Sequence, residues 1–229
     1  MDVQPGDEPT QSNQVFPAWT NTIARFSIPG ALLLFGLAIV VLLAWQRSDF
    51  VTGVGVVQEQ PVPFSHEHHV GGLGLDCRYC HTTVETGPSA GMPSTEICMT
   101  CHSQIWTNAA VLAPVRQSYQ TGIPIQWIRV YKLPDFVYFD HSIHVNKGLA
   151  CETCHGRVDE MPLTWKNASL HMEWCLNCHR APQNNLRPES AVFQMGWQGP
   201  RNQSETGQAL MEQYHTPGSL LTNCSTCHR

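Results

Sequence analysis

The chain has 229 residues, a formal net charge of −5 at pH 7 and ten cysteines. It contains no cluster of lysine and arginine, which excludes a nucleic-acid-binding surface of the usual basic kind. The length leaves room for one or two ordinary domains.

The N-terminal part combines a polar segment with an apolar one. Residues 1–26 are rich in Pro, Gln, Asn and Asp, which predicts a flexible or partner-bound tail. The uncharged stretch from Ile28 to Trp45, at about 1.5 Å per residue, nearly crosses a hydrocarbon core of about 30 Å. Arg25 and Arg47 lie outside its two ends. We therefore expect a transmembrane anchor at residues 27–47.

A cleaved signal peptide is the competing interpretation of this apolar segment. The charged start of a signal peptide normally comes directly before the apolar stretch, and an Ala-x-Ala-like cleavage site follows it. The sequence has neither feature in that form. An uncleaved anchor is therefore favoured.

Beyond this segment, the pattern Cys-x-x-Cys-His occurs five times and uses all ten cysteines. In this pattern two thiols add across the vinyl groups of a haem, and the adjacent imidazole takes one axial position on the iron. Disulfides and zinc sites are the common alternatives for paired cysteines, but a histidine after every pair favours covalent haem. The five attachment runs, numbered first to fifth, contain Cys77 and Cys80, Cys98 and Cys101, Cys151 and Cys154, Cys175 and Cys178, and Cys224 and Cys227.

Five haems c in the part of the chain that follows Cys77 leave about thirty residues for each cofactor, too few for a large side-chain core. We therefore expect the porphyrins to supply most of the buried apolar surface of a domain at residues 48–229. The predicted fold is mainly α with much irregular coil. Because c-type haem is attached on the outer side of bacterial membranes, this domain is expected on the periplasmic side and the tail in the cytoplasm.

Two His-x-x-His motifs indicate an internal repeat. Phe64 precedes His66 and His69, just as an aromatic residue precedes His141 and His144, and a haem attachment run follows each motif. The spacing places both histidines of a motif on nearly the same side of a helical turn. Two imidazoles cannot share the one vacant axial position of a single haem, so each histidine is expected to bind a different haem.

Other segments give weaker signals. His68 falls out of register with the repeat and is expected at the surface or behind the ligands. Within the haem-free insert 103–138, Ile105 to Tyr119 could form a helix broken at Pro114, and Ile123 to Tyr131 is predicted to be extended and β-rich. A second insert, 182–215, is expected to wrap a partner or cover haem edges.

The axial ligands can be counted. The proximal ligands are expected to be His81, His102, His155, His179 and His228. The two His-x-x-His motifs supply four distal ligands, so one haem needs another donor. Met172, His171 and His215 are the candidates, and spacing alone leaves the choice open. A thioether ligand would raise the potential of its haem. Since donors at least equal irons, every iron can be six-coordinate, which favours electron transfer over substrate chemistry.

These features together resemble the membrane-anchored pentahaem cytochrome c subunit of bacterial alternative complex III. The resemblance rests on the anchor, the five runs, the two Phe-x-His-x-x-His motifs, the segment 124–138 and the Met-Glu-Trp-Cys sequence at 172–175. It implies a quinol oxidoreductase in which a polytopic membrane subunit oxidises quinol beside an iron–sulfur subunit and a monohaem cytochrome c. The pentahaem subunit would relay electrons to a periplasmic acceptor or oxidase. The resemblance also implies Met172 as the fifth distal ligand.

Two other functions fit the sequence less well. A stand-alone, single-anchor multihaem quinol dehydrogenase would have its own quinol site, but five haems and the aromatic insert argue against it. A multihaem reductase of nitrogen or sulfur oxyanions would need a haem with an open position or an unusual proximal ligand. All five runs here end in histidine.

Overall fold

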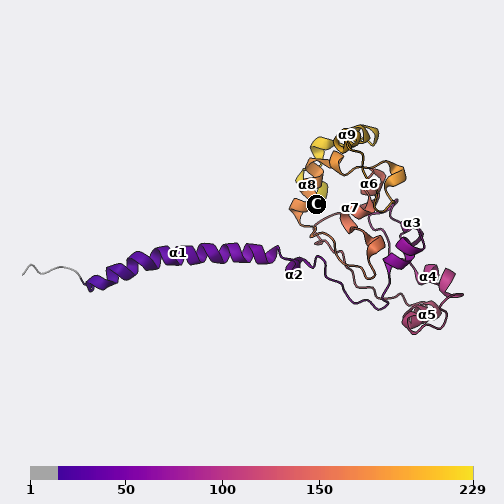
Figure 1. Ribbon diagram of the computed structural model, residues 1–229, viewed down its shortest axis with the longest axis horizontal. Coiled ribbons are helices and arrows are strands. Elements are labelled where there is room, and N and C mark those ends of the chain that lie inside the picture. The colour runs from indigo at the N-terminus through magenta and orange to yellow at the C-terminus, as the bar shows by residue number, and fades with distance from the viewer. Residues whose placement is uncertain (1–14, 229) are drawn as a thin grey trace, which may run out of the picture. The chain divides into compact units, whose positions relative to one another are not determined.

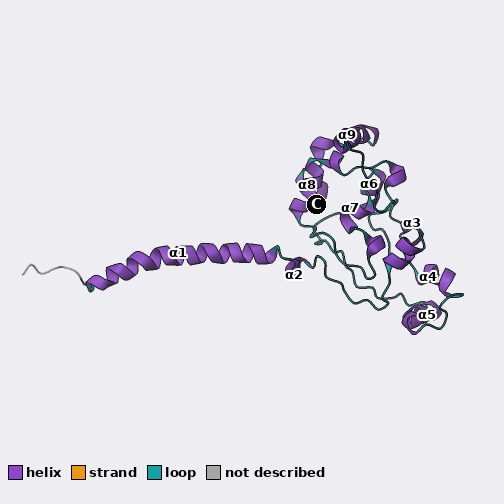
Figure 2. Ribbon diagram, in the orientation of Figure 1, coloured by secondary structure: helices purple, strands orange, loops and turns teal. Residues whose placement is uncertain are grey.

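The computed structural model describes residues 15–228, so most of the predicted tail lies outside the described residues. Within this range the chain forms helices, turns and coil, without a strand (Figure 2). The expected mainly helical fold is confirmed. By its internal contacts the chain divides into two units, Met1–Val51 and Thr52–Arg229.

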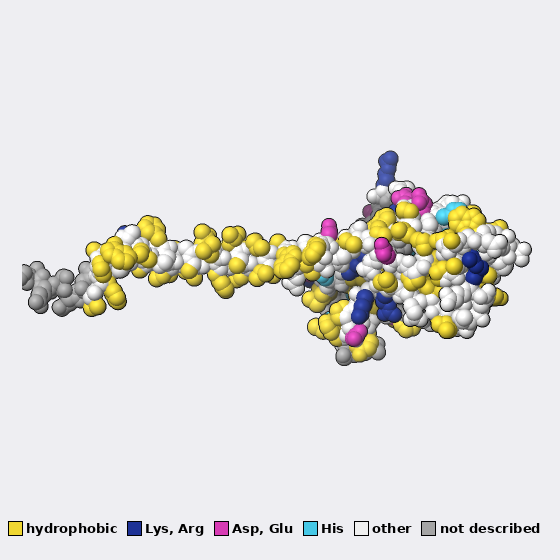
Figure 3. Space-filling view, turned by 90° about the horizontal axis from the view of Figure 1, so that it is seen from below, with side chains coloured by type: hydrophobic (Ala, Val, Ile, Leu, Met, Phe, Trp, Pro, Cys, Tyr) yellow, Lys and Arg dark blue, Asp and Glu magenta, His cyan; other side chains and the backbone are white. Residues whose placement is uncertain are grey.

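The first unit contains α1, Ala18–Gln46, an unbroken helix of 29 residues. It begins earlier than the predicted anchor and includes Arg25, and hydrophobic side chains cover most of its length (Figure 3). By length and composition it can cross a membrane, a property that anchors and signal sequences share. None of its residues is buried.

Short helical segments separated by coil make up the rest of the described chain (Figure 1). Both cysteines of each attachment run lie within one of these helices, and the histidine of the run lies in the same helix or directly after it. The α-helices are α2 Asp49–Thr52, α3 Cys77–Cys80, α4 Thr95–His102, α5 Ala113–Thr121, α6 His141–Asn146, α7 Cys151–His155, α8 Met172–Arg180, α9 Gln203–Gln213 and α10 Cys224–Cys227. The other segments are the π-helix η1 Glu67–Gly72 and the 3₁₀ helices η2 Ala110–Leu112, η3 Val158–Glu160, η4 Pro182–Asn184, η5 Glu189–Ala191 and η6 Gly218–Leu220.

The prediction of a β-rich segment at Ile123–Tyr131 is wrong, because this segment pairs with no strand. Instead, the side-chain amide of Gln60 satisfies Ile128: Nε2 donates to the Ile128 carbonyl at 2.8 Å, and the Ile128 N–H donates to Oε1 at 2.9 Å. Pro124 also lacks the N–H that a ladder would need. A single side chain therefore takes the place of a neighbouring strand.

The predicted break at Pro114 is also corrected. Pro114 lies in the first turn of α5, where a residue without an N–H and with a fixed φ is favoured. The helix therefore begins at this proline rather than being interrupted by it. It ends at Gly122, whose φ of +69° suits the left-handed conformation of a helix C-terminus.

The side-chain core is small and divided. Buried hydrophobic residues form three clusters of three residues each: Val62, Leu112 and Val115; Val84, Val145 and Val192; and Leu186, Leu210 and Tyr214. Clusters of this size bury little apolar surface for a unit of this length. This agrees with the expectation that prosthetic groups complete the interior.

The second insert wraps this chain itself. Its helix α9 packs closely on η4, since a Cβ at Gly207 would lie 1.8 Å from the Gln183 carbonyl oxygen. Farther along, the Arg187 N–H donates to the Gly148 carbonyl at 2.8 Å, and Tyr214 Oη donates to the Arg187 carbonyl at 3.1 Å. The insert therefore covers the segment between the second histidine pair and the third run.

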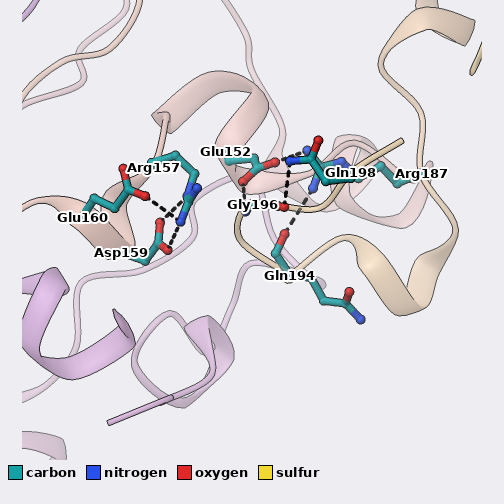
Figure 4. A network of polar contacts seen from close by, with 8 residues as sticks. All are labelled: Glu152, Arg157, Asp159, Glu160, Arg187, Gln194, Gly196 and Gln198. Atoms are coloured by element: carbon teal, nitrogen blue, oxygen red, sulfur yellow. Dashed lines mark hydrogen bonds and ion pairs between the residues drawn. The ribbon is translucent and has the colours of Figure 1, made fainter. Parts of the chain in front are cut away.

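A buried ion pair strengthens this contact. Glu152, inside the third run, accepts hydrogen bonds from Arg187 Nη2 and, at 2.6 Å, from the Gly196 N–H (Figure 4). The Arg187 side chain is 10% exposed and the Glu152 side chain 13%. Removing either partner would leave a buried charge unpaired, so the pair fixes how the insert sits on the third run.

Candidate haem-binding sites

The two His-x-x-His pairs have the same local geometry. Phe64 stacks on His69, with ring centres 4.4 Å apart and planes at 24°, and meets His66 edge-on at 4.9 Å. The second motif repeats this arrangement. Phe139 stacks on His144 at 4.5 Å and 26° and meets His141 edge-on at 4.8 Å. The repeat predicted from the sequence is thus confirmed in three dimensions.

The backbone of each motif also positions its second histidine. Asp140 caps α6, its carboxylate accepting from the Ser142 N–H at 2.8 Å, while its carbonyl accepts from His144 Nδ1 at 2.7 Å. In the first motif the Ser65 carbonyl accepts from His69 Nδ1 at 2.8 Å. In both cases the acceptor lies four residues before the histidine.

Three of the four motif histidines face the histidine of an attachment run. Two bonds of about 2.0 Å between imidazole nitrogen and metal, together with the radii of two rings, span about 6 Å. Three imidazole pairs match this separation between ring centres: His69 with His102 at 6.3 Å, His141 with His155 at 6.3 Å, and His144 with His179 at 6.2 Å. The residues therefore fit an iron held between two imidazoles.

The remaining member of the first motif lies near the first run. His66 lies close enough to His81 for the two rings to interact electrostatically. Burial and, to a smaller extent, this neighbour lower the pKa of His66 to about 4. Burial and the nearby His141 lower the pKa of His155 likewise to about 4. Both imidazoles are thus neutral at pH 7, the form that binds metal.

An oxygen atom holds Nδ1 of eight of the nine histidines expected as ligands. A proton on Nδ1 leaves the lone pair of Nε2 free for a metal and raises its basicity. The oxygen partners are the Thr164 hydroxyl for His66 and, as acceptors, the carbonyls of Ser65 for His69, Gly91 for His81, Ile105 for His102, Pro88 for His141, Asp140 for His144, Leu221 for His179 and Phe136 for His228. For His155 the Tyr131 ring packs instead, with ring centres 4.4 Å apart. Sequence analysis missed these partners, since no motif marks them.

The other three histidines of the chain differ from these nine. In the described part of the chain, His68, His171 and His215 have no such Nδ1 hydrogen bond, and all three are exposed. His68 meets the ring of His69 edge-on at 5.2 Å, which agrees with a position behind the ligands. His215 lies just beyond α9 with a φ of +50°.

The fifth run lacks a facing imidazole among the described residues. The ring of His228 contacts Phe136, with ring centres 5.9 Å apart. Nearby, Cys175 of the fourth run interacts with Cys227, which together with the larger effect of burial raises the pKa of the Cys175 thiol. Met172 begins α8 one turn before Cys175 and is 66% exposed.

The cysteines do not form the alternative sites considered from the sequence. None of the ten is paired in a disulfide. Between residues 15 and 228, no three or more His, Cys, Asp or Glu side chains converge as a metal-binding cluster of that kind. Closed zinc sites need four such donors.

Facing imidazoles beside Cys-x-x-Cys-His runs define a multihaem c-type cytochrome. Residues 62–113 match the family model described as cytochrome c7 and related cytochrome c. Over 172 residues, the chain is 30% identical to the menaquinone reductase multihaem cytochrome c subunit of Nitratidesulfovibrio vulgaris (strain Hildenborough), covering 66% of this chain and 80% of that protein. The chain therefore belongs to this family of multihaem cytochromes c.

The Phe139 ring should be needed to orient both histidines of its motif. Replacing it with Leu removes one stacked and one edge-on contact, each worth about 0.5–1.5 kcal/mol. We expect Phe139→Leu to lower the thermal midpoint of the haem-loaded protein and to broaden two low-spin haem signals in electron paramagnetic resonance (EPR) spectra. Phe50→Leu, at an 84% exposed position, is the control. Unchanged signals in the Phe139 variant would contradict this role.

Proposed function

We propose that the chain carries five covalent haems c and serves as an electron-transfer subunit of a membrane-bound quinol oxidoreductase. The observation that carries this proposal is the set of facing imidazoles at metal-bridging distance. With both axial positions taken by side chains, no open position is left for a substrate. The bound haems supply one-electron redox chemistry, while the histidines keep the same ligands in both oxidation states.

The proposed membrane location of the subunit is based on its N-terminal helix. In this proposal α1 is an uncleaved anchor in the bacterial cytoplasmic membrane, and the haem domain lies on the periplasmic side. Its partners are a polytopic quinol-oxidising subunit and an iron–sulfur subunit on one side of the relay. On the other side a monohaem cytochrome c or an oxidase accepts the electrons. The resemblance to alternative complex III and the similarity to a menaquinone reductase subunit support a quinone-linked complex.

The direction of electron flow separates two candidate functions. The resemblance favours quinol oxidation, in which two electrons and two protons leave the quinol at the partner and the electrons pass singly through this subunit. The printed name of the similar protein, a menaquinone reductase subunit, favours the reverse direction, toward quinone. The same ligand set serves both directions, because its iron ligands do not change with oxidation state.

For the fifth site we propose Met172 as the distal ligand. It shares one face of α8 with Cys175, three residues later, and Cys175 interacts with Cys227 beside His228. His171 lies outside the helix, and His215 belongs to the loop after α9. The position of Met172 on the same helix face as Cys175 supports it over the two histidines.

Replacing Met172 with Leu tests this assignment. The thioether is lost while the apolar bulk is kept, so we expect one ferric haem to become high-spin and the near-infrared band of sulfur-ligated haem to disappear. His171→Ala and His215→Ala are matched controls and should retain the band. Loss of the band in either control, with retention in the Met172 variant, would reassign the ligand.

The subunit should depend on its partners to exchange electrons with quinol. We expect a menaquinol analogue, added anaerobically, to reduce the haems rapidly in the assembled membrane complex and not in the isolated, detergent-solubilised subunit. Dithionite should reduce the isolated haems, and reoxidation by added quinone in the complex would reveal the reverse direction. Rapid reduction of the isolated subunit would instead establish a quinol site of its own.

A single distal ligand should be enough to interrupt the relay. In His144→Ala one iron loses an axial ligand, while Cys175 and Cys178 still attach its haem. We expect an unchanged number of covalent haems per chain, one high-spin haem, and quinol-dependent turnover lowered at least tenfold. His68→Ala, at an exposed histidine outside the ligand set, is the control. Normal turnover with unchanged potentials in His144→Ala would refute the ligand assignment.

A further inference from the structure

The repeat divides the haem domain into two halves, each with one histidine pair and two attachment runs. The first half, residues 64–102, brings His66 to His81 and His69 to His102. The second half, residues 139–179, pairs its four histidines in the same order. Each site is numbered here after its run. In each half, the first histidine of the motif serves the nearer run and the second histidine serves the following run.

The two halves hold each other's ligands. The distal histidine of the first site, His66, is hydrogen-bonded through Nδ1 to Thr164 Oγ1 at 3.0 Å, and Thr164 follows the third run. Conversely, Nδ1 of His141, the distal histidine of the third site, donates to the Pro88 carbonyl at 2.9 Å, and Pro88 follows the first run. The exchange is reciprocal, so neither site has its ligands positioned by its own half alone.

Backbone hydrogen bonds reinforce the same junction. The Glu67 N–H donates to the Met161 carbonyl at 3.0 Å, where η1 packs on η3. On the other side of the junction, the Ser142 N–H donates to the Gly87 carbonyl at 3.2 Å. Side-chain and backbone hydrogen bonds therefore both join the first site to the third.

The attachment runs meet at the same place. Cys77, in the first run, is a neighbour of Cys151, in the third run, and the two thiols interact. His155 of the third site also has His81 and His66 of the first site as neighbours. Two runs that are far apart in the sequence are therefore adjacent in space.

The remaining sites extend away from this junction. In the first half, Tyr79 and Thr100 join the first and second runs through a hydrogen bond of 2.7 Å. In the second half, Cys154 of the third run interacts with Cys178 of the fourth. Beyond this half, Cys227 of the fifth run interacts with Cys175 of the fourth. The fourth and fifth sites are further tied by a 2.8 Å hydrogen bond from His179 Nδ1 to the Leu221 carbonyl, three residues before the fifth run.

We propose that the five sites adjoin in the order second, first, third, fourth, fifth, and that Thr164 and Pro88 are the positioning residues of the junction between the halves. The inference rests on the proposed electron-transfer function. An electron that crosses between the halves leaves the iron of one of the two junction sites oxidised and reduces the iron of the other, with no proton and no bond change. Quinol, through the partner subunits, supplies the electron. The second and fifth sites are then the ends of the relay.

The order can be tested by counting how many low-spin haem signals a single high-spin haem perturbs. His66→Ala opens the first iron and His69→Ala opens the second, giving a high-spin ferric centre that perturbs the EPR signals of adjoining low-spin haems. We expect His66→Ala to perturb two low-spin signals and His69→Ala to perturb one. If the sites adjoined in sequence order, His66→Ala would perturb one and His69→Ala two, and the proposal would be overturned.

A milder variant tests the junction without removing a ligand. Thr164→Val keeps the shape of the side chain but removes the oxygen that holds His66 Nδ1, so the imidazole becomes less basic. We expect the potential of one haem to rise, by up to about tenfold in its one-electron equilibrium constant, about 59 mV. Thr164→Ser should retain the original potential, and Thr121→Val, at an exposed position away from the histidines, is the matched control.

The outcomes separate the junction from the proposed function. If Thr164→Val leaves all five potentials unchanged, Thr164 does not position the first site and the proposal is overturned. These spectra and titrations need only the covalent haems, reduced by dithionite. The results on the site order and on Thr164 therefore remain valid even if the membrane complex does not exchange electrons with quinol. That failure would overturn the proposed function alone.

Discussion

The arrangement of the sites depends on one interaction, the hydrogen bond from the Nδ1 of each imidazole to an oxygen atom. Side-chain packing cannot orient these rings, because the buried clusters are small and separate. In seven of the eight bonds the acceptor is a main-chain carbonyl. The course of the backbone therefore orients the ligands. This explains why a chain with so much coil can still have a defined structure: its loops are the scaffold for the imidazoles.

Single loop residues illustrate this dependence. The carbonyl of Gly91 holds His81, and the backbone there has a φ of +79°, which glycine adopts at little cost. A Cβ at this position would also lie 2.8 Å from Thr83 Oγ1. A larger residue would shift the very carbonyl that orients the ligand. In this loop, the backbone conformation at Gly91 therefore sets the orientation of the His81 ring.

The parts of the site that follow from local chemistry could be predicted from the sequence. Cys-x-x-Cys-His and His-x-x-His fix their geometry within one helical turn, so it could be predicted from spacing that the two histidines of a motif serve different haems. The run that each histidine faces, His179 for His144, came only from the structure. The roles of the Thr164 hydroxyl and the Pro88 carbonyl could not be predicted, because any position in the chain can supply such an oxygen. The prediction of a β-rich segment at 123–131 was wrong for a related reason. The amide of Gln60, which is far away in the sequence, forms the hydrogen bonds that a neighbouring strand would have formed.

The reciprocal junction also bears on how the domain folds. A His-x-x-His turn ties two sites within one half through a few bonds of backbone, and this link forms locally. The link between the halves needs residues on both sides of a long loop, so its closure entropy must be offset by contacts that form together. Thr164 cannot hold His66, nor Pro88 hold His141, until both halves are in place. Completing the first site therefore helps to complete the third, and the two halves are expected to order as one cooperative unit around their haems.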